Sequence, residues 1–167
     1  DPKMAFTDGR ARAVGSTGEL HPRGAMSLVN IGYANTLTWA NDLIPTLEKQ
    51  ALLPMFGETP VELGLAGQED VMLARLRAEP IYADAFPAAF AGEPEPITLD
   101  HVVKAIATFE RTILSGSSPY DRFVHGHDPT ALDAAAQRGR DLFFSERCEC
   151  FHCHGNFNFS DNITHAG

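Results

Sequence analysis

The sequence predicts an all-α protein, and three observations support this fold class. Apolar residues recur at helical spacing in several segments, and proline, glycine or capping residues bound these segments. No alternating run of β-branched residues competes with them, so no strand is predicted. The chain has 167 residues, of which 44% are hydrophobic and 21% charged, as expected of a soluble domain with a core of its own.

The first half of the chain is predicted to pass from loop to helix. Residues 1–35 are rich in Gly, Ser, Asn and Pro, which predicts ordered loop with short helices at most. Residues 39–56 follow with helical spacing, and Pro54 is expected to end that helix. Residues 67–80 have an amphipathic pattern that Pro80 is expected to stop.

The next elements are a short helix and the clearest helix of the chain. Residues 81–92 are expected to form a short helix broken at Pro87. Residues 97–116 form the clearest helical pattern, with Thr98 as its N-terminal cap. Its predicted apolar stripe consists of Val102, Ile106, Phe109 and Ile113.

A loop and a final helix complete the predicted order. Residues 117–130 are predicted to be loop. Residues 130–146 are predicted to be helical, capped by Thr130, and they lead directly into the cysteines. Gly139 and Phe143 lie four residues apart on this helix, as at the start of a cytochrome c domain, where the small Gly admits a partner helix.

Charge and hydropathy exclude two classes of partner. The formal net charge is −9, whereas a nucleic-acid-binding surface needs a basic face. No run is long enough to cross a membrane, and the opening DPKMAFTDGR has neither an initiator Met nor a basic-apolar leader. We therefore expect a processed chain or a piece of a longer protein.

The stretch RCECFHCHGNF, residues 147–157, contains all three cysteines. Cys150, Cys153 and His154 form C-x-x-C-H, the pattern of c-type haem attachment. Two thiols one helical turn apart can add to the two vinyl groups at one edge of a haem, and the next histidine can bind the iron. The sequence therefore predicts two thioether anchors and a proximal iron ligand.

Three other interpretations of the cysteines remain open. Zinc could be bound by the three cysteines with His154 or His165, although a second, well-separated pair of ligands is missing. A thioredoxin-like C-x-x-C would need a βαβ setting, which the sequence does not predict. A disulfide with one spare thiol is the plainest alternative. Cys148 is the odd cysteine, interpreted as a bystander or an oxidation liability.

Beyond this motif, the sequence resembles the bacterial di-haem cytochrome c peroxidase and MauG family almost end to end. The similar pieces are DPKMAFTDGRARAVG, HPRGAMSLVNIGYANTLTWAN, LEKQALLPMFGETPVELG, VVKAIATFERTILSGSSPYDRF and GRDLFFSERCECFHCHGNFNFSD. The sequence is most similar to the MbnH-like branch of this family, whose members partner a copper-binding protein. The resemblance implies a cytochrome c-like di-haem peroxidase architecture, incomplete at both ends. Residues 1–128 would be part of the first, peroxidatic haem domain and the interdomain region, without its C-x-x-C-H, and residues 129–167 the start of the second domain.

The resemblance also implies an activity. The parent protein would be a periplasmic enzyme that uses hydrogen peroxide to oxidise a redox donor or a protein partner, such as a copper-binding protein. It would carry haem c on Cys150 and Cys153 and a second haem outside this chain, and haem c attachment implies export. The alternative from another class is an electron-transfer cytochrome c domain without enzymatic activity, which needs no acid–base residue.

The family's peroxide pocket is built from Q-x-x-x-P followed by V-E-x-G, matched here by Gln50, Pro54 and Glu62. The resemblance makes Glu62 the acid–base group that moves the peroxide proton, with Gln50 and Pro54 lining and positioning. Without the resemblance, Glu62 would be interpreted as a solvated loop carboxylate. Glu58 is the nearby competitor.

Other residues take their expected roles from the same resemblance. Trp39, the single Trp, would relay electrons between the haems. His21 is expected to be a capped or surface histidine, with ligation of the first haem as the minority view. Gly24 stands where the family often has a calcium-binding Asn, which puts calcium in doubt. His125 and His127 are expected to be surface residues.

Overall fold

The computed structural model describes residues 1–38, 41, 43–155 and 157–160. Within these residues the chain is helical, with isolated bridges and no strand, which confirms the all-α prediction. In chain order the elements are η1 (Pro2–Met4), η2 (Ile31–Tyr33), α1 (Leu47–Phe56), α2 (Glu69–Ala78), α3 (Pro80–Ala89), α4 (Leu99–Arg111), α5 (Pro119–Val124), α6 (Ala134–Phe143), α7 (Phe151–His154) and η3 (Phe157–Phe159).

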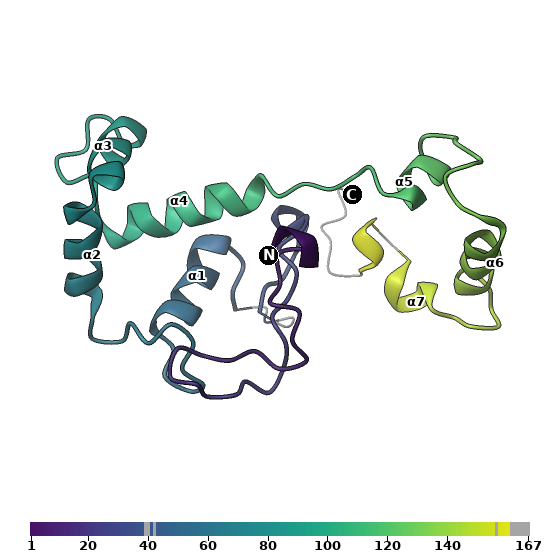
Figure 1. Cartoon of the computed structure of the whole chain (residues 1–167), viewed down its shortest axis with the longest axis horizontal. Coiled ribbons are helices and arrows are strands. Elements are labelled where there is room, and N and C mark those ends of the chain that lie inside the picture. Colours follow the sequence, from purple (N-terminus) through teal and green to yellow (C-terminus); the bar gives the residue numbers. More distant parts are fainter. Residues whose placement is uncertain (39–40, 42, 156, 161–167) are drawn as a thin grey trace.

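Figure 1 shows two groups of helices joined by one stretch of chain. In the first group α1 packs along α4, and α2 packs on α3 at the far end of α4. Residues 112–118 leave the end of α4 and lead to α5, α6 and α7, which lie apart from the first group. The C-x-x-C-H motif is therefore carried by a different group of helices from α1.

Apolar contacts between the helices form two buried clusters. The larger cluster consists of Ala51, Met55, Leu73, Phe86, Ile97, Val102 and Val103. The smaller cluster consists of Leu37, Leu47 and Ala107. Ala107 of α4 has no exposed surface, and its small side chain lets Leu47 of α1 pack closely.

Helix α1 is shorter at its start and longer at its end than the sequence predicted. It begins after Thr46, whose side-chain oxygen accepts a hydrogen bond from the Lys49 N–H at 3.2 Å. The prediction that Pro54 ends the helix was wrong, because Pro54 lies within the last turn and the helix continues to Phe56. A proline in the last turn removes one hydrogen bond, and packing of α1 on α4 outweighs that loss.

Two predictions concern the prolines of α3, and only the one at Pro80 is confirmed. The predicted stop of α2 before Pro80 is confirmed, and Pro80 itself is the first residue of α3, where its missing N–H has no helical partner to lose. The predicted break at Pro87 was wrong, since α3 continues through it to Ala89. The Phe90 N–H closes the helix on the Phe86 carbonyl at 2.9 Å.

Helix α4 confirms its predicted cap but not its predicted stripe. The Thr98 side chain accepts a hydrogen bond from the His101 N–H at 3.2 Å. Ile106 and Phe109 are 38% and 59% exposed, so those two members of the stripe were wrongly predicted to be buried. The face that is buried consists of His101, Val102, Val103, Ala107 and Glu110. Contact with α1 selects this face.

The second group of helices differs from the prediction at two places. The predicted loop 117–130 contains α5, which begins at a capping box formed by Ser118 and Asp121. Helix α6 is capped by Asp133, which accepts a hydrogen bond from the Ala136 N–H at 2.7 Å. Thr130 was therefore the wrong cap, and its hydroxyl instead donates to an Asp128 carboxylate oxygen at 2.6 Å.

Glu110 is the one acidic residue on the buried face of α4. It is 8% exposed, and its Oε2 atom has no hydrogen-bond partner among the described residues. Burial raises the pKa of the Glu110 carboxyl above its ordinary value, since the charged form loses its hydration. The neighbouring Arg111 opposes this rise in pKa only in part, because its guanidinium is paired with Glu48 at 2.7 Å.

Replacement of Glu110 by glutamine is expected to stabilise the fold at neutral pH by about 1 kcal/mol, since it removes a buried charge without a partner. The pKa of Glu110 is higher in the folded chain than in the unfolded chain. Stability should therefore fall as the pH rises from the unfolded pKa, about 4.3, through the folded pKa. Urea unfolding at pH 4 and pH 7 measures this, and Glu110→Gln should flatten the difference. An unchanged pH dependence would contradict the assignment.

Candidate functional site

A cavity of about 400 Å³ lies between the N-terminal loops and α1. Gln50 projects from α1 to its wall, and Glu62 reaches it from the loop after α1. His21 and Arg23 line the same cavity from the N-terminal loop. The structure thus brings together two of the three residues that the Q-x-x-x-P and V-E-x-G pieces single out.

Pro54 does not line this cavity but supports the loop that carries Glu62. Its carbonyl accepts a hydrogen bond from the Leu63 N–H at 2.8 Å, which fastens the loop to the end of α1. On the other side, the Ser16 N–H donates to the Glu62 carbonyl at 2.7 Å. These two bonds hold the Glu62 backbone, while its side chain is 47% exposed. The competitor Glu58 is exposed and lies off the cavity wall.

His21 was expected to be a capped or surface histidine, and the structure shows that it is not at the surface. Only 8% of it is exposed. Its Nε2 lies 3.3 Å from the Val61 carbonyl oxygen, and its Nδ1 lies 4.0 Å from Glu62 Oε1. Its backbone is held as well, because its N–H donates to the Ala13 carbonyl at 2.9 Å. The ring is therefore fixed next to the predicted acid–base group.

Gly24 also lines the cavity, and the structure shows why no side chain stands there. A Cβ at this position would lie 2.5 Å from the Arg10 carbonyl oxygen. An Asn could occupy the position only if that backbone moved. Gly24 itself has no side-chain oxygen for a calcium ion, so calcium at this position remains a doubtful expectation.

The C-x-x-C-H motif forms α7, a single helical turn. The Cys153 N–H donates to the Cys150 carbonyl at 3.3 Å, which sets the two cysteines one turn apart. His154 Nδ1 lies 2.8 Å from the Phe159 carbonyl oxygen, so Nδ1 carries the proton and Nε2 keeps its lone pair. Cys153 and His154 are exposed, and Cys150 is half-buried. This donor set fits haem c, with two accessible thiols and one oriented imidazole.

The structure bears on the other interpretations of the cysteines. All three thiols are free, so the predicted alternative of a disulfide is wrong. Among the described residues, no three His, Cys, Asp or Glu side chains gather closely enough to hold a metal ion, which disfavours zinc. His165, the remaining zinc candidate, lies outside the described residues. Cys148 is exposed.

Asn30 connects the N-terminal loops to the segment after the motif, a role that sequence reasoning missed. It is 5% exposed, and its side-chain amide donates to the Ser115 carbonyl at 2.9 Å and to Asn158 Oδ1 at 3.3 Å. Its Oδ1 accepts from the Ser115 N–H at 2.8 Å. Asn158 directly precedes Phe159, whose carbonyl orients His154. Asn30 thus supports the segment that holds the iron ligand.

Helix α6 leaves the Gly139 position open. A Cβ at Gly139 would meet nothing within 4 Å, so the expected partner helix does not pack there among the described residues. An apolar cavity of about 320 Å³ lies on this face, lined partly by Phe143 and Phe159.

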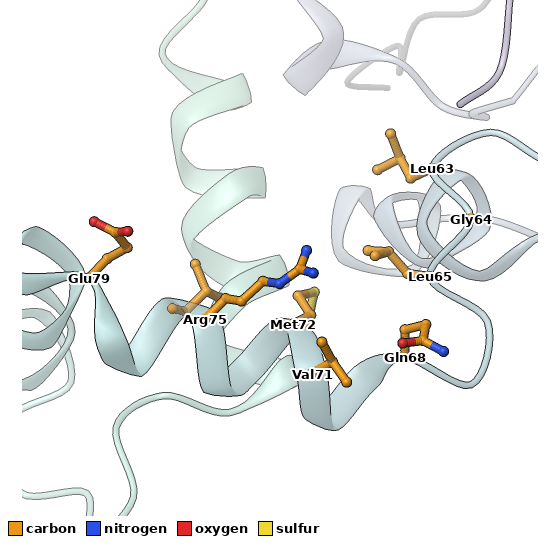
Figure 2. A pocket seen from close by; sticks show the side chains of 9 residues that line it. Leu63, Gly64, Leu65, Gln68, Val71, Met72, Arg75 and Glu79 are labelled. Carbon is orange, nitrogen blue, oxygen red and sulfur yellow. The ribbon is translucent and has the colours of Figure 1, made fainter. Parts of the chain in front are cut away.

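A further pocket of about 470 Å³ lies along α2 (Figure 2). Leu63 and Leu65 face Val71 and Met72 across it, with Arg75 farther along the helix (Figure 2). Its lining contains no histidine, no cysteine and none of the predicted site residues. Glu62, Gln50 and the C-x-x-C-H residues therefore all lie away from this pocket.

The sequence model of the di-haem cytochrome c peroxidase family matches residues 1–129, more than half of the chain. The chain belongs to the di-haem cytochrome c peroxidase family. Haem c is the cofactor that membership of this family implies, and the donor set on α7 fits it.

Individual relatives agree with the family assignment. The chain is 35% identical to the methylamine utilization protein MauG of Methylorubrum extorquens, over 99% of this chain and 44% of that protein. It is 36% identical to the cytochrome-c peroxidase IdrP1 of Denitromonas iodatirespirans, over 96% of this chain and 41% of that protein. The chain therefore spans less than half the length of these relatives.

One solved structure is similar to this chain over almost its whole length. The crystal structure of a MauG-like protein associated with microbial copper homeostasis superposes with a TM-score of 0.90 and 42% identity, covering 98% of this chain and 47% of that one. This similarity confirms the family, and the association of that protein with copper homeostasis agrees with the MbnH-like branch expected from the sequence.

Two further expectations concern Trp39 and the crossing of a membrane. Trp39, the residue expected to relay electrons between the haems, lies outside the described residues. None of the described helices combines the length and the apolar character needed to cross a bilayer.

Proposed function

We propose that this chain is the part of a di-haem c-type peroxidase that carries the acid–base residues for hydrogen peroxide and the attachment site of the second haem. The placement of Glu62 and Gln50 on one cavity supports this proposal most directly. A cytochrome that only carries electrons needs the haem ligands on α7 but has no use for a carboxylate beside a cavity. The domain division expected from the sequence, at residues 128 and 129, is part of the proposal.

Glu62 is proposed to move one proton. The carboxylate takes a proton from the peroxide oxygen that binds first and returns it to the oxygen that leaves as water. Gln50 donates a hydrogen bond that orients peroxide, and Pro54 holds the Glu62 loop through the Leu63 N–H. Overall, two electrons and two protons convert hydrogen peroxide to two waters.

The cofactor and the source of electrons complete the proposal. Haem c, when bound, supplies the iron that binds peroxide and exchanges electrons. Cys150 and Cys153 would anchor the second haem, and His154 would offer Nε2 to its iron, while Trp39 is proposed to relay electrons between the two haems. The donor is a small redox protein or a protein side chain that becomes oxidised. Because a MauG-like relative is associated with copper homeostasis, a copper-binding protein is one such partner.

The proposed location is the periplasm. Haem c is attached outside the cytoplasm, where an oxidising environment is also usual. The relatives named MauG and cytochrome-c peroxidase agree with a role in peroxide-dependent oxidation.

The test uses the complete gene product, loaded with haem, in a stopped-flow spectrometer. Peroxide should oxidise the haems rapidly, and a reduced small redox protein should then be oxidised with a stoichiometry of two electrons per peroxide. A protein that exchanges electrons with the donor but does not respond to peroxide would be an electron carrier, and the proposal would be wrong.

A further inference from the structure

Asn30 has no part in the proposed reaction, yet its side-chain amide is buried and fully hydrogen-bonded. Only 5% of the residue is exposed. Its Oδ1 accepts from the Ser115 N–H at 2.8 Å, and its Nδ2 donates to the Ser115 carbonyl at 2.9 Å and to Asn158 Oδ1 at 3.3 Å. A side-chain amide has two N–H donors, so both donors of Asn30 are used.

The Ser115 backbone determines which way this amide points. A backbone N–H only donates and a carbonyl only accepts, so Oδ1 must face the Ser115 N–H and Nδ2 the Ser115 carbonyl. The opposite orientation would place donor against donor and acceptor against acceptor. The Asn30 backbone is held as well, because its N–H donates to the Ile113 carbonyl at 2.8 Å. The second N–H of Nδ2 is therefore fixed in its direction toward Asn158.

These contacts join the N-terminal loops to the segment after the C-x-x-C-H motif. Asn30 directly precedes η2, which packs on α4 in the first group of helices. Asn158 lies in η3, which follows α7 in the second group. A ring contact links the same two segments, since Tyr33 of η2 meets Phe157 of η3 edge to face, with 5.4 Å between the ring centroids.

The turn at η3 holds His154, and it needs support from its surroundings. The Phe159 carbonyl oxygen lies 2.8 Å from His154 Nδ1. Asn158 and Phe159 are both left-handed, with φ of 61° and 52°, a conformation that is unfavourable for side-chain-bearing residues unless neighbouring contacts hold it. Tyr120 and Phe143 of the second group hold the Phe159 ring, with centroid distances of 4.8 and 5.6 Å. The residue before it is held by the N-terminal loops.

We propose that Asn30 is a positioning residue for His154: by holding Asn158, it fixes the turn whose carbonyl orients the imidazole. The iron ligand at α7 then takes part of its orientation from the N-terminal loops, which also line the Glu62 cavity. This inference rests on the proposed attachment of haem at α7. Groups that orient a metal-bound histidine typically change metal affinity or activity by about 10–100-fold when they are removed.

The test measures how fast the His154 Nδ1 proton exchanges with deuterium in the haem-loaded complete gene product. NMR can follow this proton, because a ferric haem shifts the signals of its histidine ligand away from the rest of the protein. The variants are Asn30→Gly, Asn158→Gly and the double variant, since glycine suits the left-handed backbone at both positions. His127→Gly is the matched control, because His127 is also left-handed, with φ of 53°, and is exposed.

We expect the Nδ1 proton to exchange at least about tenfold faster in Asn30→Gly and in Asn158→Gly. The double variant should exchange no faster than the faster single variant, because both substitutions remove the same hydrogen bond. His127→Gly should exchange as the unaltered protein does. An unchanged rate in Asn30→Gly, or increases that multiply in the double variant, would overturn the inference.

Asn158→Asp separates the hydrogen bond from the backbone freedom that glycine adds. A carboxylate oxygen still accepts from Asn30 Nδ2, so this variant should exchange as slowly as the unaltered protein, and fast exchange would count against the inference. If Asn30→Gly does not fold without its bonds to Ser115, Asn158→Gly decides, because it leaves those bonds in place. Slow exchange in Asn158→Gly would then overturn the role of Asn30, and fast exchange there with slow exchange in Asn158→Asp would support it.

The intact mass separates this inference from the proposal on which it rests. If the mass shows no haem on Cys150 and Cys153, the proposed attachment fails, and the role of Asn30 fails with it. If haem is attached there and Asn30→Gly exchanges at the unaltered rate, only the inference about Asn30 fails.

Discussion

Glu62→Gln in the haem-loaded protein is expected to lower kcat/KM for hydrogen peroxide by about 10²–10⁴-fold, the usual contribution of a general acid–base group. Glutamine keeps the shape and the polarity of the side chain but can neither take the peroxide proton nor return it. The Pro54 and Ser16 backbone contacts to this loop do not involve the carboxyl, so the loop should keep its conformation. Stopped-flow mixing with peroxide measures the loss directly.

Glu58→Gln is the matched control for this experiment. Glu58 lies on the same loop and is exposed, but it does not line the cavity. Its replacement should leave kcat/KM within about twofold of the unaltered protein, as expected for a surface position away from the reacting groups. If Glu58→Gln lowers kcat/KM and Glu62→Gln does not, Glu58 is the acid–base residue. If neither variant lowers kcat/KM, neither carboxylate takes part in the reaction.

Replacement of Cys150 and Cys153 together by serine is expected to abolish covalent haem at α7. Serine cannot form the thioether bonds, and the exposed turn gives the haem little else to hold it. The intact mass of the double variant should be lower by one haem, apart from the two sulfur-to-oxygen changes. The pyridine haemochrome signal should fall by the fraction of the total signal that this haem contributes.

Cys148→Ser is the control for the attachment experiment. Cys148 is exposed and lies outside the C-x-x-C-H spacing, so this variant should keep its haem content and mass increment. His154→Ala should keep the thioethers but lose the imidazole ligand, which would shift the visible spectrum. Haem retained in the double variant would show that the thiols are not the anchors.

The helices could be predicted where local chemistry determines them. Thr98 caps α4 as expected, because a hydroxyl before an amphipathic run satisfies a free N–H wherever the helix packs. Pro54 and Pro87 were expected to end helices, yet both lie inside them. A proline inside a helix removes one backbone hydrogen bond, and whether the helix continues depends on tertiary packing.

The sequence predicted which residues form the candidate site but not how these residues are arranged in space. The spacing of the C-x-x-C-H motif was sufficient to single out Cys150, Cys153 and His154, because attachment depends on one helical turn. His21 was expected to be a capped or surface histidine, since no sequence pattern shows that a loop histidine lies beside the Glu62 carboxylate of a loop far along the chain. A side chain that is buried by long-range contacts in loops has no periodicity to reveal it.

The hydrogen bond between His154 Nδ1 and the Phe159 carbonyl also affects redox thermodynamics. A carbonyl that accepts the Nδ1 proton draws it away from the ring, which makes the imidazole a stronger electron donor through Nε2. A stronger donor stabilises the ferric state more than the ferrous state, so the reduction potential of an iron bound there is lowered. The loop after α7, which Asn30 holds through Asn158, would thereby help to set how readily a haem bound at α7 gives up its electron.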